Sequence, residues 1–221
     1  MRLGFIQNMR QLLFPQRCML CRKVLPGGGK PWCETCRAAL QEQETVREGM
    51  FVSPVWAALS YEGEVREAIL RYKFQRKRGY AREFGSVLAD CVRARLAGQY
   101  DLITWVPVSA RREKQRGYDQ AMLLASAMAL ELGDVAASTL CKIVDNPAQS
   151  GLKSRAERES NVLGAYRAVD HELVAGRRIL LIDDIVTTGA TMEEAARTLL
   201  DAGAETVVGA ALARPPEHTK D

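Results

Sequence analysis

From about residue 50 onward, short apolar runs alternate with amphipathic stretches. Runs of strand length occupy residues 55–61, 102–108, 139–144, 178–182 and 205–212. Stretches with helical spacing or helix-forming composition occupy residues 64–74, 80–96, 120–132 and 191–201. Because strands that alternate with helices are joined by crossover connections, this order predicts an α/β fold: a mostly parallel sheet flanked by helices on both faces.

The first 50 residues do not follow this alternation. Residues 2–13 place apolar side chains on one face at helical spacing, which predicts a short docking helix rather than a membrane anchor. Pro15 ends that segment, and four cysteines follow it. We therefore expect two parts: an N-terminal helix with a zinc-ribbon-like module at 1–50, and the main α/β domain at 51–221.

Composition adds the expected class and compartment. The chain has 221 residues, of which 47% are hydrophobic and 26% charged, an ordinary globular balance. No charge-free stretch reaches the ~18 residues of a membrane span. The N-terminus has polar residues where a signal peptide has its apolar core, so we expect a cytoplasmic protein with reduced thiols.

The net charge of +4 conceals an uneven distribution. Residues 66–82 hold seven lysines and arginines against one glutamate, and residues 183–221 hold eight acidic against three basic residues. We call residues 66–82 the basic stripe. Solvated helix faces would account for it, but it also suits a polyanionic ligand.

The four clustered cysteines form two Cys-x-x-Cys knuckles, Cys18 with Cys21 and Cys33 with Cys36. Two knuckles offer four thiolates in the tetrahedral geometry that Zn²⁺ accepts, and four cysteines leave no position open for a catalytic water. The eleven intervening residues suit a β-hairpin. Two disulfides would need an oxidising compartment, and paired knuckles favour zinc over an iron–sulfur cluster. The pattern predicts a structural zinc ion.

An acidic pair, Asp183 and Asp184, follows the apolar run 178–182. The loop after the pair opens a predicted helix, whose N-terminus attracts anions. Carboxylates beside a phosphate site can accept hydrogen bonds from sugar hydroxyls or hold Mg²⁺, which indicates a ribose phosphate. The residues of this phosphate loop are Thr187, Thr188, Gly189, Ala190 and Thr191.

Two other interpretations of the acidic pair were weighed. In the first, a loop threonine only caps the helix and the aspartates are solvated. In the second, the pair ends a Walker B strand of a nucleotide triphosphatase. That enzyme also needs Gly-x-x-x-x-Gly-Lys-Ser/Thr. The only Gly-Lys, at Gly29 and Lys30, has Val24 and Pro31 at the flanking motif positions, so we reject this interpretation.

A basic loop follows the apolar run 102–108 and suits a diphosphate, although a solvated helix start would also account for it. Its candidate residues are Val108, Ser109, Arg111 and Arg112.

A long polar stretch at residues 145–164 separates two predicted strands. Such loops often act as lids, and its basic residues could close over a diphosphate. A solvated surface helix is the alternative. The candidate residues of this mobile loop are Gln149, Lys153, Arg155 and Arg158.

Residues 183–191 resemble the 5-phosphoribosyl-1-diphosphate (PRPP) signature of type I phosphoribosyltransferases. The resemblance implies that Asp183 and Asp184 contact the ribose 2- and 3-hydroxyls, that residues 187–191 hold the 5-phosphate, and that Mg²⁺ accompanies PRPP. Purine-base transferases of this fold often carry an aspartate where this chain has Thr187, so the resemblance favours another, unidentified acceptor.

The whole chain resembles the ComF/GntX family, which is associated with bacterial natural competence. The resemblance is carried in order by the four cysteines, the Arg-Gly-Tyr-Asp-Gln-Ala motif at 116–121, the Gln-x-x-Leu and Arg-x-x-Arg-x-x-Asn motifs at 149–161, and the PRPP loop. Family members usually have Asn at the position of Asp119, so this chain has an additional negative charge near the basic loop.

Two functions therefore remain open: a Mg-dependent phosphoribosyltransferase, or a binding module for single-stranded DNA or a protein of the uptake machinery. The second would use the zinc module and the basic stripe, whose Tyr72, Phe74 and Tyr80 could stack on bases. Aromatic residues at this spacing are more often part of a core.

Overall fold

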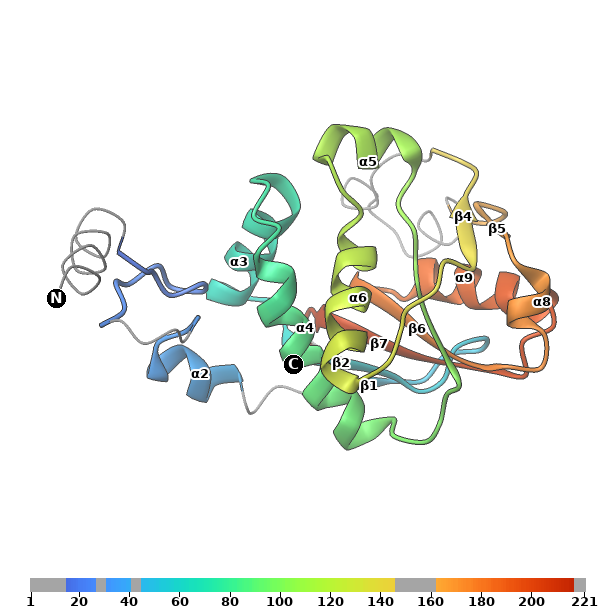
Figure 1. Cartoon of the computed structure of the whole chain (residues 1–221), viewed down its shortest axis with the longest axis horizontal. Helices are drawn as coiled ribbons and strands as arrows, with labels where there is room; N and C mark the ends of the chain where they lie inside the picture. The colour runs from blue at the N-terminus through green and yellow to red at the C-terminus, as the bar shows by residue number, and fades with distance from the viewer. Residues whose placement is uncertain (1–14, 27–30, 41–44, 146–161, 217–221) are drawn as a thin grey trace, which may run out of the picture.

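The computed structural model describes residues 15–26, 31–40, 45–145 and 162–216, and the predicted helix at 2–13 lies outside them. Figure 1 shows a central sheet with helices on both sides and the cysteine segment at one end. The sheet has the order β1-β2-β7-β6-β3. These strands are β1 (Thr45–Arg47), β2 (Val55–Ser60), β7 (Thr206–Arg214), β6 (Arg178–Ile185) and β3 (Leu102–Trp105).

The predicted α/β architecture is confirmed. Strands β2, β7, β6 and β3 are parallel, and the edge strand β1 is antiparallel to β2. β1 pairs Thr45 with Ala57, so the sheet takes its edge strand from the range assigned to the N-terminal module.

Helices cover both faces because the side chains of β6 alternate. Leu180 and Ile182 join one buried cluster, and Ile179 and Leu181 join the other. The first cluster contains residues of α3 (Gly63–Phe74), α4 (Tyr80–Arg95) and α6 (Gln120–Leu132). The second contains residues of α9 (Ala190–Asp201). Gly133 ends α6 with a φ of 75°, the left-handed conformation that glycine adopts at low cost.

The remaining elements are short. β4 (Leu140–Lys142) and β5 (Tyr166–Ala168) pair antiparallel in a separate two-stranded sheet, so the apolar run at 139–144 does form a strand but not in the main sheet. The helices α5 (Ala110–Arg116) and α8 (His171–Val174) follow β3 and β5.

The cysteine segment packs on the first cluster. Cys18, Met19 and Leu20 are buried in it, and the Trp32 ring lies 6.5 Å from that of Phe84 in α4. The segment ends with α2 (Glu34–Leu40). Because the segment has no separate core, its apolar side chains depend on α3 and α4 for burial. No helix within the described ranges has the length and apolarity needed to cross a bilayer.

Candidate functional site

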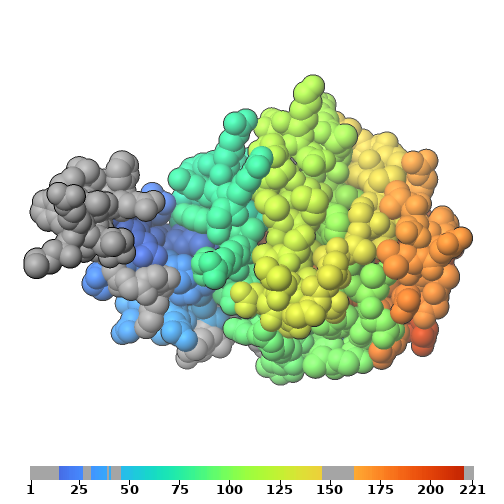
Figure 2. Space-filling model, viewed as in Figure 1, coloured from blue at the N-terminus to red at the C-terminus, as the bar shows by residue number. Residues whose placement is uncertain are grey.

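A cleft of about 440 Å³ lies between α3, the ends of β3 and β6, and the β4–β5 pair. Figure 2 shows α3 (teal) beside α5 and α6 (green), with the cysteine segment (blue) on the far side of α3. The residues lining the cleft include five cations and two carboxylates, a balance that favours a polyanionic ligand. These charged residues are Arg66, Lys73, Arg112, Arg116, Lys142, Asp183 and Asp184.

The acidic pair lies inside β6 rather than after it, because the parallel ladder with β7 continues to Ile185. Since neighbouring strand residues face opposite sides, the two carboxylates meet different walls. Asp184 lies 2.8 Å from the Lys73 amine on the α3 wall. Asp183 interacts electrostatically with Lys142 of β4. The pair therefore bridges both walls of the cleft.

Burial and the adjacent Asp184 carboxylate raise the pKa of Asp183 well above its usual range. The Asp183 carboxylate accepts a hydrogen bond from the Asp184 backbone N–H at 2.7 Å. Burial also lowers the pKa of Lys142. The ionised acidic pair thus needs external stabilisation, which hydroxyl donors or a cation can supply.

The predicted phosphate loop connects β6 to α9, and its Thr187 and Thr191 line the cleft. Gly189 has a φ of 80° and caps α9. A Cβ at this position would clash with the Arg47 guanidinium and force that side chain to shift, so conformation is the stronger reason for glycine here. Arg47 in turn lies 3.1 Å from Glu193 of α9. This contact could not be predicted from the sequence, because sheet pairing alone brings β1 close to the loop.

The four residues of the predicted diphosphate loop do not all face the cleft. Val108 and Arg112 line the cleft. Ser109 is buried, where its hydroxyl accepts from the Arg112 N–H at 3.3 Å and donates to Asp145 at 2.5 Å. The Arg111 side chain is 84% exposed and lies 3.3 Å from Asp145. The segment is also the start of a helix, as the alternative interpretation predicted, because Ser109 is the N-cap of α5.

Asp119 fixes the basic loop to α6. Its Oδ2 accepts the Val108 backbone N–H at 2.9 Å, and its Oδ1 accepts the Met122 N–H at 3.0 Å. Burial raises the pKa of this carboxyl. The Asp119 carboxyl, which was expected to add a negative charge near the basic loop, is therefore a buried acceptor of two hydrogen bonds. An aspartate directly before a predicted helix is the sequence signal for such an N-cap.

The basic stripe separates into three groups. Arg66 and Lys73 line the cleft, and Arg71 binds backbone carbonyls of the cysteine segment. The third group consists of exposed cations that do not line the cleft: Arg76, Lys77, Arg78 and Arg82.

The aromatic residues of the stripe also differ from one another. Tyr72 is fully buried, and Tyr80 packs edge-on against Phe84 with ring centroids 6.0 Å apart. Phe74 is 62% exposed, and the Arg116 guanidinium lies 5.0 Å from its ring centroid. The core interpretation therefore describes Tyr72, while Phe74 belongs to the cleft wall.

The four mobile-loop candidates, Gln149, Lys153, Arg155 and Arg158, lie outside the described residues. The two strands that their segment connects each contribute to the cleft, β4 through Lys142 and β5 through Tyr166. The Lys142 amine lies 3.3 Å from the Tyr166 hydroxyl.

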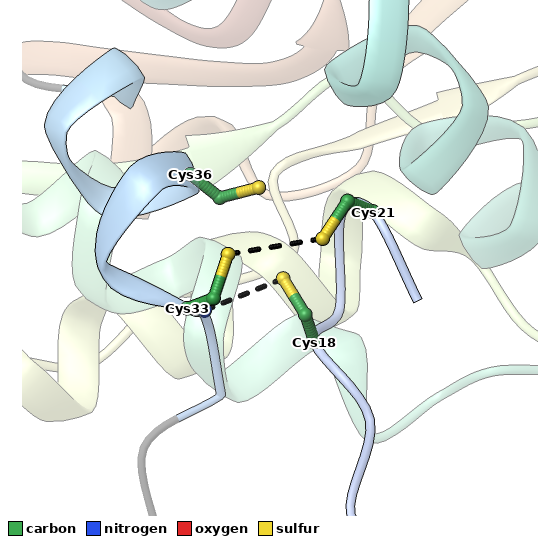
Figure 3. A group of neighbouring side chains, drawn as sticks. All are labelled: Cys18, Cys21, Cys33 and Cys36. Atoms are coloured by element: carbon green, nitrogen blue, oxygen red, sulfur yellow. Dashed lines mark hydrogen bonds between the residues drawn. The ribbon is translucent and has the colours of Figure 1, made fainter. Parts of the chain in front are cut away.

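The four clustered cysteines meet at one point (Figure 3), with all four Sγ atoms within 4.8 Å of one another. The Cys21 and Cys33 sulfurs are 3.7 Å apart. A tetrahedron with Zn–S bonds of ~2.3 Å has edges of about 3.8 Å, so the cluster is compatible with zinc. All four are free thiols, which argues against the two disulfides.

The thiol of Cys18 is prepared for metal binding. Burial raises its pKa, but hydrogen bonds from the backbone of Cys33, Cys21 and Leu20 outweigh this effect and lower the pKa to about 7. Burial and the neighbouring thiols raise the pKa of Cys36, so the ligating thiolate forms more readily at Cys18 than at Cys36.

A magnesium ion has fewer donors available. Outside the four cysteines, the described part of the chain contains no group of three or more potential metal-ligating side chains. Asp184 already binds the Lys73 amine. The acidic pair alone does not form a metal cage, so Mg²⁺ would fit here only with phosphate oxygens of a ligand completing its coordination.

The sheet, the acidic strand end and the loop that opens α9 define a type I phosphoribosyltransferase-like fold. Residues 119–221 match the family described as "Phosphoribosyl transferase domain". The B. subtilis glutamine PRPP amidotransferase aligns with 64% of this chain and 28% of its own chain, at 25% identity and a TM-score of 0.44.

Relatives that align with most of this chain are named competence proteins and DNA utilization proteins. Competence protein F of Haemophilus influenzae is 29% identical over 208 residues, covering 89% of this chain and 90% of the relative. ComFC of Bacillus subtilis is 26% identical over 196 residues, covering 84% and 78%. DNA utilization protein YhgH of Escherichia coli K12 is 29% identical over 220 residues, covering 89% and 96%. The chain is thus a homologue of the ComF competence proteins, which confirms the resemblance seen in its motifs.

Proposed function

We propose that the cleft binds PRPP and that the chain is a Mg-dependent phosphoribosyltransferase with a role in DNA uptake like that of its ComF relatives. The observation that carries this proposal is the acidic pair near the C-terminal end of β6, separated from the phosphate loop by two residues, in a cleft whose lining contains five cations. A ribose with phosphates at both ends matches carboxylates flanked by anion-binding groups.

Each part of the ligand has a candidate partner. Asp183 and Asp184 would accept the ribose hydroxyls, and the loop 187–191 would hold the 5-phosphate. Among the described cations, Arg112 and Lys142 are the candidates for binding the diphosphate. Arg112 lies in the cleft after β3, and Lys142 interacts with Asp183. Arg111 is too exposed to contribute without moving.

The reaction would be a displacement at ribose C1. The bond from C1 to the diphosphate oxygen breaks with its electron pair leaving on the diphosphate, and the acceptor donates the pair that forms the new bond to C1. The cations of the cleft would stabilise the charge on the leaving group, and the carboxylates would orient the ribose. Magnesium carried by the diphosphate would add to this neutralisation. Thr187 cannot accept a proton at neutral pH, which disfavours a purine acceptor.

Calorimetry with PRPP, with and without Mg²⁺, tests binding directly. We expect saturable binding that is strengthened by Mg²⁺ and lost in Asp183→Asn plus Asp184→Asn. Asp90→Asn, at an exposed position on α4, is the matched control and should bind like wild type. Diphosphate release in the presence of candidate acceptors then tests turnover. No PRPP binding by wild type would refute the proposal.

We also propose that the four cysteines hold one structural zinc ion. Compatible sulfur spacing supports this assignment. Elemental analysis of purified protein should give about one zinc per chain. Protein that is folded, fully reduced and free of zinc or any other metal would contradict it.

The second candidate is a non-catalytic module that contacts single-stranded DNA or a protein of the uptake machinery. The observation that favours it is the exposed part of the basic stripe, Arg76, Lys77, Arg78 and Arg82. Binding to a fluorescent oligonucleotide should then fall steeply with salt and with Arg76→Gln plus Lys77→Gln. PRPP binding without turnover over a broad set of acceptors would favour this candidate over the enzyme.

A further inference from the structure

Lys73, on the opposite wall of the cleft, forms an ion pair with Asp184 of the acidic pair. Its amine lies 2.8 Å from Asp184 Oδ1, and the two side chains are only 15% and 12% exposed. The preceding residue, Tyr72, is fully buried, and its hydroxyl donates to the Gln120 carbonyl at 2.8 Å. This anchor fixes the last turn of α3, so Lys73 is held in place beside Asp184.

The ion pair changes what the acidic pair can bind. Two adjacent carboxylates attract a divalent cation, but the ammonium group neutralises one of their two charges. It also acts on Asp183, whose pKa Lys73 lowers against the effects of burial and Asp184. A bare cation, or a neutral diol, that binds Asp184 Oδ1 must displace the partly buried ammonium group that contacts this oxygen. Such displacement leaves that ammonium without its partner, which is costly in a half-buried site.

A ligand with phosphates avoids this cost. When vicinal hydroxyls take over Asp184, a phosphoryl oxygen in the same cleft can accept the displaced ammonium, whose flexible four-carbon stem permits the transfer. We propose that Lys73 is a specificity-determining residue: it excludes bare divalent cations and neutral sugars from the acidic pair and selects ligands that combine vicinal hydroxyls with a phosphate. This inference rests on the proposed function, since it assigns the ribose to the same pair.

The test compares wild type, Lys73→Gln and the control Arg177→Gln. Arg177 is an exposed cation just before the opposite end of β6, so its loss makes the same change in net charge away from the cleft. Mn²⁺ alone, followed by electron paramagnetic resonance, probes the bare cation, and calorimetry measures PRPP in the presence of Mg²⁺. Lys73→Gln should bind Mn²⁺ about tenfold more tightly and PRPP about tenfold more weakly, while the control should match wild type in both.

The two arms separate the possible failures. Unchanged Mn²⁺ affinity in Lys73→Gln would overturn the inference even if PRPP binding weakened, because Lys73 would then be only an anion ligand. Unchanged PRPP affinity would overturn it as well. If wild type does not bind PRPP, the proposed function fails and the Mn²⁺ arm alone decides whether Lys73 excludes cations. Lys73→Arg, which keeps the charge, should retain the exclusion and serves if Lys73→Gln does not fold.

Discussion

Arg71 joins α3 to the first cysteine knuckle, so its replacement tests what holds the cysteine segment in place. Its Nη2 donates to the Met19 carbonyl at 2.9 Å and to the Leu20 carbonyl at 2.7 Å. Both carbonyls belong to the turn between Cys18 and Cys21. Replacement of Arg71 by methionine keeps an unbranched apolar stem but removes both donors.

The size of the effect follows from these two contacts. A hydrogen bond to a charged group contributes ~1.5–3 kcal/mol, and a buried carbonyl left without a donor adds a penalty. The Nε atom of Arg71 is buried and has no hydrogen-bond partner among the described residues, so its removal recovers part of that loss. We expect Arg71→Met to weaken the folded cysteine segment by about 3 kcal/mol, which corresponds to about a 150-fold change in an equilibrium constant.

Competition for zinc measures this change, because folding of the segment and metal binding are linked. The protein is titrated with a chromophoric chelator, and the apparent zinc affinity of Arg71→Met should fall by about two orders of magnitude. Arg82→Met, at an exposed position on α4, is the control and should behave like wild type. Zinc affinity within threefold of wild type in Arg71→Met would refute the reasoning.

Three further predictions concern the main domain. Glu193→Gln should lower the free energy of unfolding in urea by about 2 kcal/mol, because the Glu193 carboxylate accepts two backbone N–H groups, at 3.2 and 2.8 Å, and also binds Arg47. Glu172→Gln, at an exposed position of α8, is the control and should leave this free energy unchanged. Gly189→Ala should also cost about 2 kcal/mol, since it strains a φ of 80° and displaces Arg47; an unchanged urea midpoint would contradict this. Because burial raises the pKa of Asp119, the folded state binds that proton more tightly than the unfolded chain does, so its contribution to stability falls as the pH rises above about 4. Asp119→Asn should remove that slope from urea midpoints measured between pH 4 and 7, and parallel profiles would count against it.

The elements with a strong local signal could be predicted from sequence. The apolar run at 178–182 is a buried strand, and the helix at 120–132 ends where Gly133 permits a left-handed turn. The cysteine cluster was also predictable, because each knuckle places two thiols within a few residues of each other. Such features depend on neighbours in the chain rather than on the rest of the fold.

Features that depend on distant pairing could not be predicted in this way. Charged residues usually end a strand, yet β6 continues through the acidic pair because Asp183 and Ile185 pair with Ala211 and Ala213 of a longer neighbour. Lys73 was assigned to the basic stripe because nothing in its local sequence shows which wall of a cleft it will face. Lys142 lines the cleft because β4 pairs with β5 outside the main sheet, and this pairing has no local signal in the sequence.

The last turn of α3 connects two parts of the chain that are far apart in the sequence. Successive helical residues point about 100° apart, so three consecutive side chains reach three different surroundings. Arg71 binds the cysteine knuckle, Tyr72 enters the core, and Lys73 binds Asp184 in the cleft. The four-cysteine segment and the acidic pair are therefore held by neighbouring residues of one helical turn, although they lie more than 140 residues apart in the sequence.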